Sequence, residues 1–305
     1  MNDDPALVQS IRQRLENHAR KSGQDIQRTL VRYALERLLY RLSISDHRDR
    51  FILKGAMLFS VWDGAPFRAT GDLDLLGNGP NTEEALAKVF REICAIPIAE
   101  PDGLNFNTDA INTAQLRLST DYSGVALRFD AMLGRARLRM QVDIGFGDAI
   151  TPGPIDVKFP TILQMPAPNL RAYPPETVIA EKLEAMVSLG VATTRIKDFF
   201  DVWAISQSFD FESPTLIAAL KATFNRRGTI IPASEPVALS DLFARDADKQ
   251  RLWAAFASDR IDATAAPQDL TGLITEIRMF TAPLLAAIAN DGPRMRWDCR
   301  AGKWL

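Results

Sequence analysis

The stretch Lys54–Leu76 constrains the fold more than any other part of the sequence. It reads KGAMLFSVWDGAPFRATGDLDLL: a Gly-Ala step opens an apolar run, a break follows at residues 63–66, and an Asp-Leu-Asp-Leu alternation ends it. Residues two apart in a strand share a face. The alternation therefore predicts a strand that buries its leucines and places Asp72 and Asp74 side by side on the opposite face.

Asp72 and Asp74 form a candidate cation site. Two neighbouring carboxylates disfavour joint ionisation unless a cation lies between them. Oxygen ligands on a short strand suit Mg²⁺, which keeps several waters and also binds substrate phosphates. We therefore expect Mg²⁺ here, with Mn²⁺ as a substitute ion. The alternative is a solvated strand end that carries two acids, because the Asp-x-Asp pattern is common.

A second alternation, over residues 137–146, predicts another strand of the same sheet. Its apolar residues share one face, and Asp143 lies on the other face among polar neighbours. If this strand lies beside the Asp-x-Asp strand, Asp143 can join the two acids. The alternative is an exposed strand aspartate. Arg135, Arg137 and Arg139 lie along the same polar face and are candidates for a local RNA-facing patch.

The composition excludes several classes of function. The net charge is −2 and the pI is about 5.8, so no overall basic balance indicates nucleic acid binding. Both histidines precede the organising stretch, which argues against a histidine zinc site or a Ser-His-Asp triad. The two cysteines are far apart, which is typical of a reducing cytoplasm. No apolar run approaches transmembrane length, so we expect a cytoplasmic protein without a membrane partner.

The pattern along the chain predicts a mixed α/β (α+β) protein in three regions. We expect an N-terminal helical cap at 1–48, an α/β core at 49–170 and a helical C-terminal region at 171–305. Apolar spacing predicts two helices within the cap, for which core packing is favoured over a DNA-binding role. Seven prolines between 150 and 175 mark the boundary before the last region.

Two predicted helices of the last region carry charged residues of interest. Lys182 falls within the apolar face of a helix at about 175–190, so it must reach water or meet an anion. The next helix places Lys197, Asp198 and Asp201 opposite its apolar stripe. An ordinary Lys197–Asp201 ion pair on a solvated face explains that second group equally well.

Five motifs appear in the order typical of one protein family. They are KGA at 54–56, RATGDLDL at 68–75, VDIGFGD at 142–148, YPPETVIAEKLEAM at 173–186 and RIKDFFD at 195–201. With these motifs, over roughly residues 48 to 205, the sequence resembles the AbiEii/AbiGii abortive-infection toxins. These belong to the DNA polymerase β-like nucleotidyltransferases and form the toxin half of bacterial toxin–antitoxin pairs.

The resemblance implies a polymerase β-like mixed sheet and a set of site residues. It implies Asp72 and Asp74 as metal ligands, Lys182 as the lysine on the nucleotide phosphates and Asp198 as a further active-site acid. We expect nucleotide contacts from Lys54, Gly55, Ala56, Arg68, Thr70, Lys182, Arg195 and Lys197. Ala56 departs from the Ser or Gly of many nucleotidyltransferases, but its backbone N–H can still contact phosphate.

The expected reaction is Mg²⁺-dependent transfer of a nucleoside monophosphate from a triphosphate to a hydroxyl. In a two-metal site, Asp72 and Asp74 hold the ion on the triphosphate, and Asp143 shares the ion that activates the acceptor. By resemblance the acceptor is a tRNA 3′ end, the role is that of a growth-arresting toxin, and the partner is a winged-helix antitoxin. The alternatives are a small-molecule or protein hydroxyl as acceptor, or a non-catalytic nucleotide-binding module.

Overall fold

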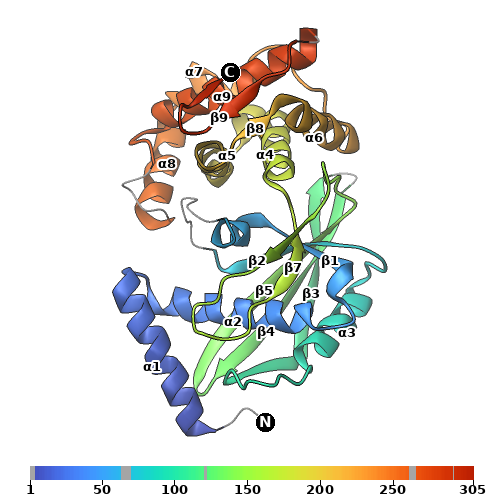
Figure 1. Cartoon of the computed structure of the whole chain (residues 1–305), viewed down its shortest axis with the longest axis vertical. Coiled ribbons are helices and arrows are strands. Elements are labelled where there is room, and N and C mark those ends of the chain that lie inside the picture. The colour runs from blue at the N-terminus through green and yellow to red at the C-terminus, as the bar shows by residue number, and fades with distance from the viewer. Residues whose placement is uncertain (1–3, 63–69, 120–121, 261–265, 291) are drawn as a thin grey trace. The chain divides into compact units, whose positions relative to one another are not determined.

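The chain divides into two compact units, and each is described by itself. The computed structural model describes residues 4–62, 70–119, 122–260, 266–290 and 292–305. The first unit comprises Met1–Val61, Ala69–Gly147 and Ile155–Ala172; the second comprises Trp62–Arg68, Asp148–Pro154 and Tyr173–Leu305. Figure 1 labels the elements of both units. The three-region division expected from the sequence stays a prediction.

The first unit is built on a seven-stranded mixed sheet. Its helices are α1 (Pro5–Ser22), α2 (Ile26–Ser43) and α3 (Glu83–Cys94), with short 3₁₀ segments η1 (Arg48–Arg50) and η2 (Gly55–Ser60). Its strands are β1 (Phe51–Lys54), β2 (Asp72–Gly77), β3 (Leu104–Ser119), β4 (Tyr122–Leu133), β5 (Ala136–Phe146), β6 (Ile155–Lys158) and β7 (Asn169–Ala172). The mixed α/β class is confirmed.

The strand order is β3-β4-β5-β2-β1-β7-β6. The pairs β2–β5 and β1–β7 are parallel, and the other neighbours are antiparallel. The parallel β2–β5 pair confirms that the two alternating segments are neighbours. β3 is one strand over Leu104–Ser119, although its register with β4 shifts between Asn107 and Asn112. That irregularity interrupts the apolar alternation.

Polar side chains set the ends of the first helices. Asp4 caps α1 by accepting a hydrogen bond from the backbone N–H of Ala6, and Asp25 caps α2 by accepting one from Arg28. Gly23 ends α1 with φ +65°, a left-handed conformation that favours glycine. At α3 the cap is Thr82, whose side-chain oxygen accepts a hydrogen bond from the backbone N–H of Ala85.

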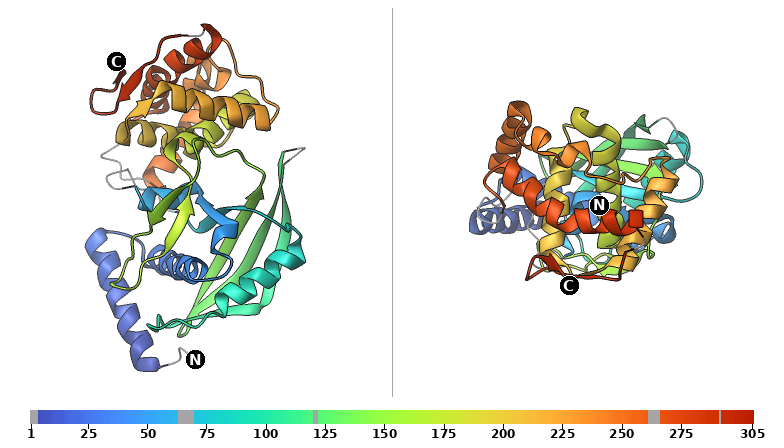
Figure 2. Two further views of the ribbon diagram at one scale, coloured as in Figure 1. Left: turned by 45° about the vertical axis from the view of Figure 1, so that its right-hand side comes forward. Right: turned by 90° about the horizontal axis from the view of Figure 1, so that it is seen from above.

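The alternation in β5 separates a buried face from an open one. Leu138, Met140, Val142 and Ile144 are each at most 2% exposed. α2 lies on β5, α3 lies on β3, and the two helices contact each other, so they cover this apolar face (Figure 2, left). Polar residues of β5 therefore occupy the opposite face, as the period of two requires.

Helix α2 also carries buried polar groups that hold the loop between β6 and β7. Arg41 forms an ion pair with Asp102 at 2.5 Å, and both side chains are buried. Arg37 donates to the carbonyl oxygen of Pro166, and Glu36 accepts from the backbone N–H of Ile162 at 2.8 Å. Burial raises the pKa of Glu36 to about 7, although the Ile162 hydrogen bond, Arg37 and Arg32 favour its charged form.

The second unit is mainly helical. Its principal helices are α4 (Pro175–Leu189), α5 (Ile196–Ser208), α6 (Ser213–Arg226), α7 (Asp241–Ala244), α8 (Ala247–Arg260) and α9 (Leu270–Asn290). The short segments are η3 (Gly190–Ala192) and η4 (Val237–Leu239), and a small sheet joins β8 (Phe211–Glu212), β9 (Arg296–Asp298) and β10 (Lys303–Trp304).

The C-terminal tail packs on the core of the second unit. Trp297 is 1% exposed and donates its indole N–H to the carbonyl oxygen of Ser206 at 2.7 Å. Trp304 donates to the carbonyl oxygen of Phe280 at 2.8 Å and stacks on its ring. The indole N–H groups of both tryptophans are committed to backbone carbonyls, which favours docking.

Helix α9 corrects one expectation about hydropathy. It has 21 residues, and an 18-residue window within it has a mean hydropathy of 1.4, so by length and composition this helix passes the test for a membrane span. The expectation that no apolar run approaches that length was therefore wrong. Its apolar residues Ile274, Ile277 and Phe280 are fully buried, and the helix packs against α5. This burial is typical of a core helix.

Glu36 predicts a pH dependence of stability. Because burial raises its pKa to about 7 in the folded state, the folded chain binds more protons than the unfolded chain just below that pH. Stability from this group is present at low pH and is lost as the pH rises through 7. Relative to Glu36→Gln, wild type should lose about 2 kcal/mol of unfolding free energy between pH 5 and pH 8.

Urea unfolding at several pH values measures this difference. Glutamine keeps an oxygen that can accept from Ile162 and does not titrate. The exposed Glu84 on α3 supplies the control, since Glu84→Gln should keep the wild-type pH profile. Parallel profiles for wild type and Glu36→Gln would contradict the prediction.

Candidate active site

Three strands of the first unit place charged residues in one row. Asp74 on β2 pairs with Asp143 on the parallel strand β5 and with Lys54 on the antiparallel strand β1. Residues directly opposite each other lie on the same face of a sheet. Asp72 lies on this face one row away, opposite Gln141. The acids predicted from two separate segments are therefore brought together.

Gln141 holds the carboxylate of Asp143. Its side-chain amide donates to both carboxylate oxygens of Asp143, each at 3.0 Å. Its own carbonyl oxygen accepts from the Nε of Arg128 at 3.0 Å. Asp143 is half-buried, so two hydrogen bonds from one amide favour its charged form and fix its orientation.

Gly55 makes room for the carboxylate of Asp74. Its φ is +73°, which L side chains rarely adopt. A Cβ atom at this position would lie 2.0 Å from Oδ2 of Asp74. Two independent constraints therefore require glycine here, and the Gly-Ala step of the motif has a local physical cause.

The other residues of the first unit that were expected to contact the nucleotide lie in different surroundings. Thr70 accepts from the backbone N–H of Asp72 at 3.3 Å and steadies the start of β2. Ala56 is 2% exposed, so it is buried at the start of η2. Lys54 is half-buried at the end of β1. Arg68 lies outside the described residues.

The acids fit a hard divalent cation by donor type. Asp72, Asp74 and Asp143 supply only carboxylate oxygens, which Mg²⁺ and Mn²⁺ prefer. Among the described residues no three His, Cys, Asp or Glu side chains form a ready metal-binding group. The side-chain amide of Gln141 already donates hydrogen bonds to both carboxylate oxygens of Asp143. Asp72 and Asp74 are therefore the stronger candidates for metal ligands.

In the second unit Lys182 lies between two aspartates. Its ammonium is 2.9 Å from Oδ1 of Asp198 and 2.6 Å from Oδ2 of Asp201. Arg195 adds a bond to Oδ2 of Asp198 at 2.5 Å. Burial alone would raise the pKa of Asp198, but Lys182 and Arg195 hold it well below its usual range. The anion that Lys182 requires is thus supplied by the protein.

Two expectations for these helices were wrong. Asp198 and Asp201 are 1% and 0% exposed, so they are not part of a solvated face. Lys197 is exposed and forms no hydrogen bond or ion pair with a described residue, so the expected Lys197–Asp201 pair is absent. Asp201 pairs across to α4 because α4 and α5 are packed together.

A second charged cluster lies next to these helices. Arg227 contacts Asp148 at 3.2 Å, Glu181 at 3.4 Å and Glu184 at 2.7 Å. The hydroxyl of Tyr173 bonds both Asp148 and Glu181 at 3.2 Å. Burial opposes the charge of Arg227, but the three carboxylates raise its pKa. This cluster ties the residues before α4 to the end of α6.

Several of these roles were missed in the sequence. The signal for Gln141 was present, because it lies two residues before Asp143 on the same strand face. The signal for Asp201 was its spacing of three residues from Asp198, which gives both side chains nearly the same direction on a helix. Arg227 had no local signal, since its three partners are 43 to 79 residues away in the chain.

The chain is similar to one described protein family. A model of the family "Nucleotidyl transferase AbiEii toxin, Type IV TA system" matches residues 37–271, more than half of the chain. No curated protein matches. Two solved structures each share 16% identity with this chain. One is JHP933 from Helicobacter pylori, which matches with a TM-score of 0.46 over 85% of this chain and 91% of its own. The other, an H. pylori protein provisionally described as a nucleotidyltransferase, has a TM-score of 0.44 over 85% and 94%.

Gly55 gives a direct test of the first cluster. Gly55→Ala should destabilise the chain by roughly 1 to 3 kcal/mol, since it adds both backbone strain and a clash with Asp74. Gly71→Ala is the matched control, because nothing lies within 4 Å of a Cβ there. Thermal melting compares the two variants. Equal melting temperatures would show that Asp74 can move aside at no cost.

Lys182 gives a test of the second cluster. Lys182→Met should lower the unfolding free energy by roughly 3 kcal/mol, because it leaves Asp201 buried without its cation. Lys197→Met is the matched control on an exposed lysine and should change stability by less than about 0.5 kcal/mol. Urea unfolding of both variants decides the point. A stable Lys182→Met protein would mean that the two aspartates are not held by this lysine.

Proposed function

Because the chain belongs to the AbiEii family of nucleotidyl transferase toxins of type IV toxin–antitoxin systems, and is thus a transferase, we propose that it transfers a nucleoside monophosphate to RNA. The donor is a nucleoside triphosphate, the acceptor is the 3′ hydroxyl of a tRNA, and Mg²⁺ is the cofactor. The observation that carries this proposal is the shared sheet face of Asp72, Asp74 and Asp143.

The first unit supplies groups for both halves of the reaction. Asp72 and Asp74 would hold Mg²⁺, which when bound offsets the negative charge of the triphosphate. Asp143, oriented by Gln141, accepts a hydrogen bond from the acceptor hydroxyl, directs its oxygen at the α-phosphorus and takes up the hydroxyl proton as the oxygen attacks. The new P–O bond forms as the bond to the β-phosphate breaks, and pyrophosphate leaves. Positioning and electrostatics carry this chemistry, with no covalent intermediate on the protein.

We assign the second unit a role in binding phosphate. Arg195 is half-exposed and holds Asp198 with its Nε, while Lys197 is fully available to an anion. Lys182 is 12% exposed, and its ammonium contacts Asp198 and Asp201. Asp198 and Asp201 keep this lysine charged and oriented. Because the charge of Lys182 is already paired within the protein, a phosphate that binds here is not required to neutralise a buried, unpaired charge.

The family also supports an antitoxin partner. We propose a winged-helix antitoxin as that partner and the cytoplasm as the place of action. A labelled-nucleotide assay tests the reaction: the chain is incubated with each labelled nucleoside triphosphate, Mg²⁺ and total RNA, and the products are separated on a gel. Label in the tRNA band supports the proposal, and no labelled RNA with any of the four nucleotides would overturn it.

Substitution of the acids tests the assigned roles. Asp72→Asn and Asp74→Asn should each lower kcat by a hundredfold or more, about the loss expected for one well-placed electrostatic contact. Asp143→Ala should lower kcat more than it weakens nucleotide binding, since its task is to position the acceptor. The exposed Asp49 gives the control, and Asp49→Asn should transfer normally. Normal turnover in either Asp72→Asn or Asp74→Asn would remove the metal assignment.

A further inference from the structure

Four arginines lie on or beside the open sheet face that carries the acids. Arg137 and Arg139 precede Gln141 and Asp143 on β5 at intervals of two residues, so all four share one face. Arg128 pairs in register with Gln141 from β4, and Arg135 lies in the turn between the two strands. We call Arg128, Arg135, Arg137 and Arg139 the arginine track.

The track is exposed and positively charged. All four arginines are exposed in the first unit. Asp130 is the one acid of β4 beside them, and it pairs with Arg137 at 2.7 Å. Arg139 forms no hydrogen bond or ion pair with a described residue, so its guanidinium is available to a ligand. A chain of net charge −2 thus concentrates cations beside its candidate acids.

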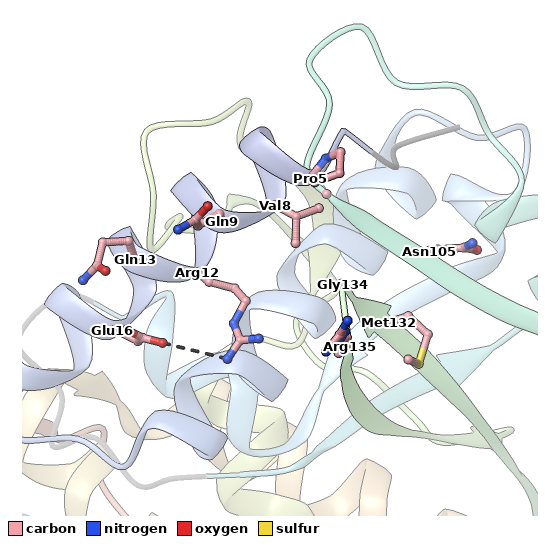
Figure 3. Close-up of a pocket in the computed structure, with 11 residues that line it drawn as sticks. Pro5, Val8, Gln9, Arg12, Gln13, Glu16, Asn105, Met132, Gly134 and Arg135 are labelled. Atoms are coloured by element: carbon pink, nitrogen blue, oxygen red, sulfur yellow. Dashed lines mark ion pairs between the residues drawn. The ribbon is translucent and has the colours of Figure 1, made fainter.

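The track ends at a groove against α1. The groove has a volume of about 650 Å³ and is lined by residues of α1, β3, β4 and the Arg135 turn. Figure 3 shows Gln9 and Gln13 on α1, with Asn105 and Met132 on the strands. Amide groups both donate and accept hydrogen bonds, and Met132 offers an apolar surface. These groups suit the edges and faces of unpaired bases.

The length of the track fits a short stretch of nucleic acid. A strand rises about 3.3 Å per residue, so Arg139 lies roughly 13 Å and Arg135 roughly 27 Å along the chain from Asp143. Guanidinium groups bind phosphate oxygens in a bidentate manner. The arginines are regularly spaced and lead toward Asp143, the carboxylate that would position the acceptor hydroxyl. This arrangement fits a linear polyanion with a reactive hydroxyl at its end.

We propose that the arginine track binds the phosphodiester backbone of a single-stranded RNA end, with its 3′ hydroxyl at Asp143 and upstream nucleotides toward the α1 groove. This proposal rests on the proposed function, because Asp143 is the acceptor-side group only in that reaction. It adds the path of the acceptor strand. Arg128 links the arginine track to the acids, because it donates a hydrogen bond to Gln141 and lies at the end of the track nearest Asp143.

Fluorescence anisotropy with a labelled single-stranded RNA tests the track directly. The full chain is titrated into a 12-nucleotide RNA with a free 3′ hydroxyl, without nucleoside triphosphate, at 50 to 200 mM salt. Each lost phosphate contact on a single strand should lower the slope of log K against log salt by about 0.7 and weaken binding about fivefold at 100 mM. We expect this for Arg139→Gln and twice the slope change for Arg137→Gln combined with Arg139→Gln.

The controls separate this proposal from a general loss of charge or fold. Lys88→Gln removes an exposed cation from α3 and should bind RNA as wild type does. The double variant should keep the wild-type melting temperature and its shift with Mg²⁺ and nucleoside triphosphate. Identical affinity and salt slope in wild type and double variant would overturn the proposal. Equal loss in the Lys88→Gln control would also overturn it.

Failure of the proposed function gives a different result. If wild type binds the RNA through the arginines but transfers no label to any RNA, the track stands as an RNA site and the proposed reaction fails. If label is transferred and the double variant does so with unchanged KM for RNA, the reaction stands and the track is overturned. An acidic peptide that displaces the RNA at equal concentration would indicate a protein partner and also overturn it.

Discussion

The parallel pairing of β2 with β5 is the constraint on which the candidate active site depends. It sets Asp74 opposite Asp143 and Asp72 opposite Gln141, although these residues are about seventy positions apart in the chain. A slip of one residue would turn Asp143 toward the apolar helices and bring Val142 to the open face. The register is held by burial, because Leu73, Leu75, Val142 and Ile144 are all 0% exposed. The apolar face of the sheet thereby positions the candidate acids on the opposite face.

The second unit uses a different kind of constraint. Asp198 and Asp201 are buried acids that share the ammonium of Lys182, and removing this lysine takes a cation from both of them. Such a cluster stabilises little in total, yet it fixes the direction of each side chain. Arg195 extends the cluster to the surface, because it bonds Asp198 while half of its own side chain is exposed. A buried network with one exposed cation at its edge is suited to meet an anion.

Much of the fold could be read from periodicity. The strands β2 and β5 and the helices α1, α2, α4 and α5 were predictable because their apolar spacing is strong and their ends carry caps or glycine. The same spacing placed Lys182 on an apolar face but could not name its partners, since Asp198 and Asp201 meet it only when α4 and α5 pack. Asp198 and Asp201 therefore looked solvated. Likewise the amide of Gln141 follows from strand period, whereas its contact with Arg128 needs the β4–β5 register.

The charge on the polar face of β5 changes from positive to negative along the strand. Arginines lie toward one end and an aspartate toward the other, with Gln141 between them. A neutral amide is a consistent choice at that point. An acid there would add a third like charge next to Asp72 and Asp143, and a cation would form an ion pair with Asp143 and neutralise it. Glutamine donates to Asp143 and accepts from Arg128, so it transmits orientation without cancelling either charge. The two-residue period of a single strand is thus sufficient to place cations, a neutral spacer and an acid in sequence on one surface.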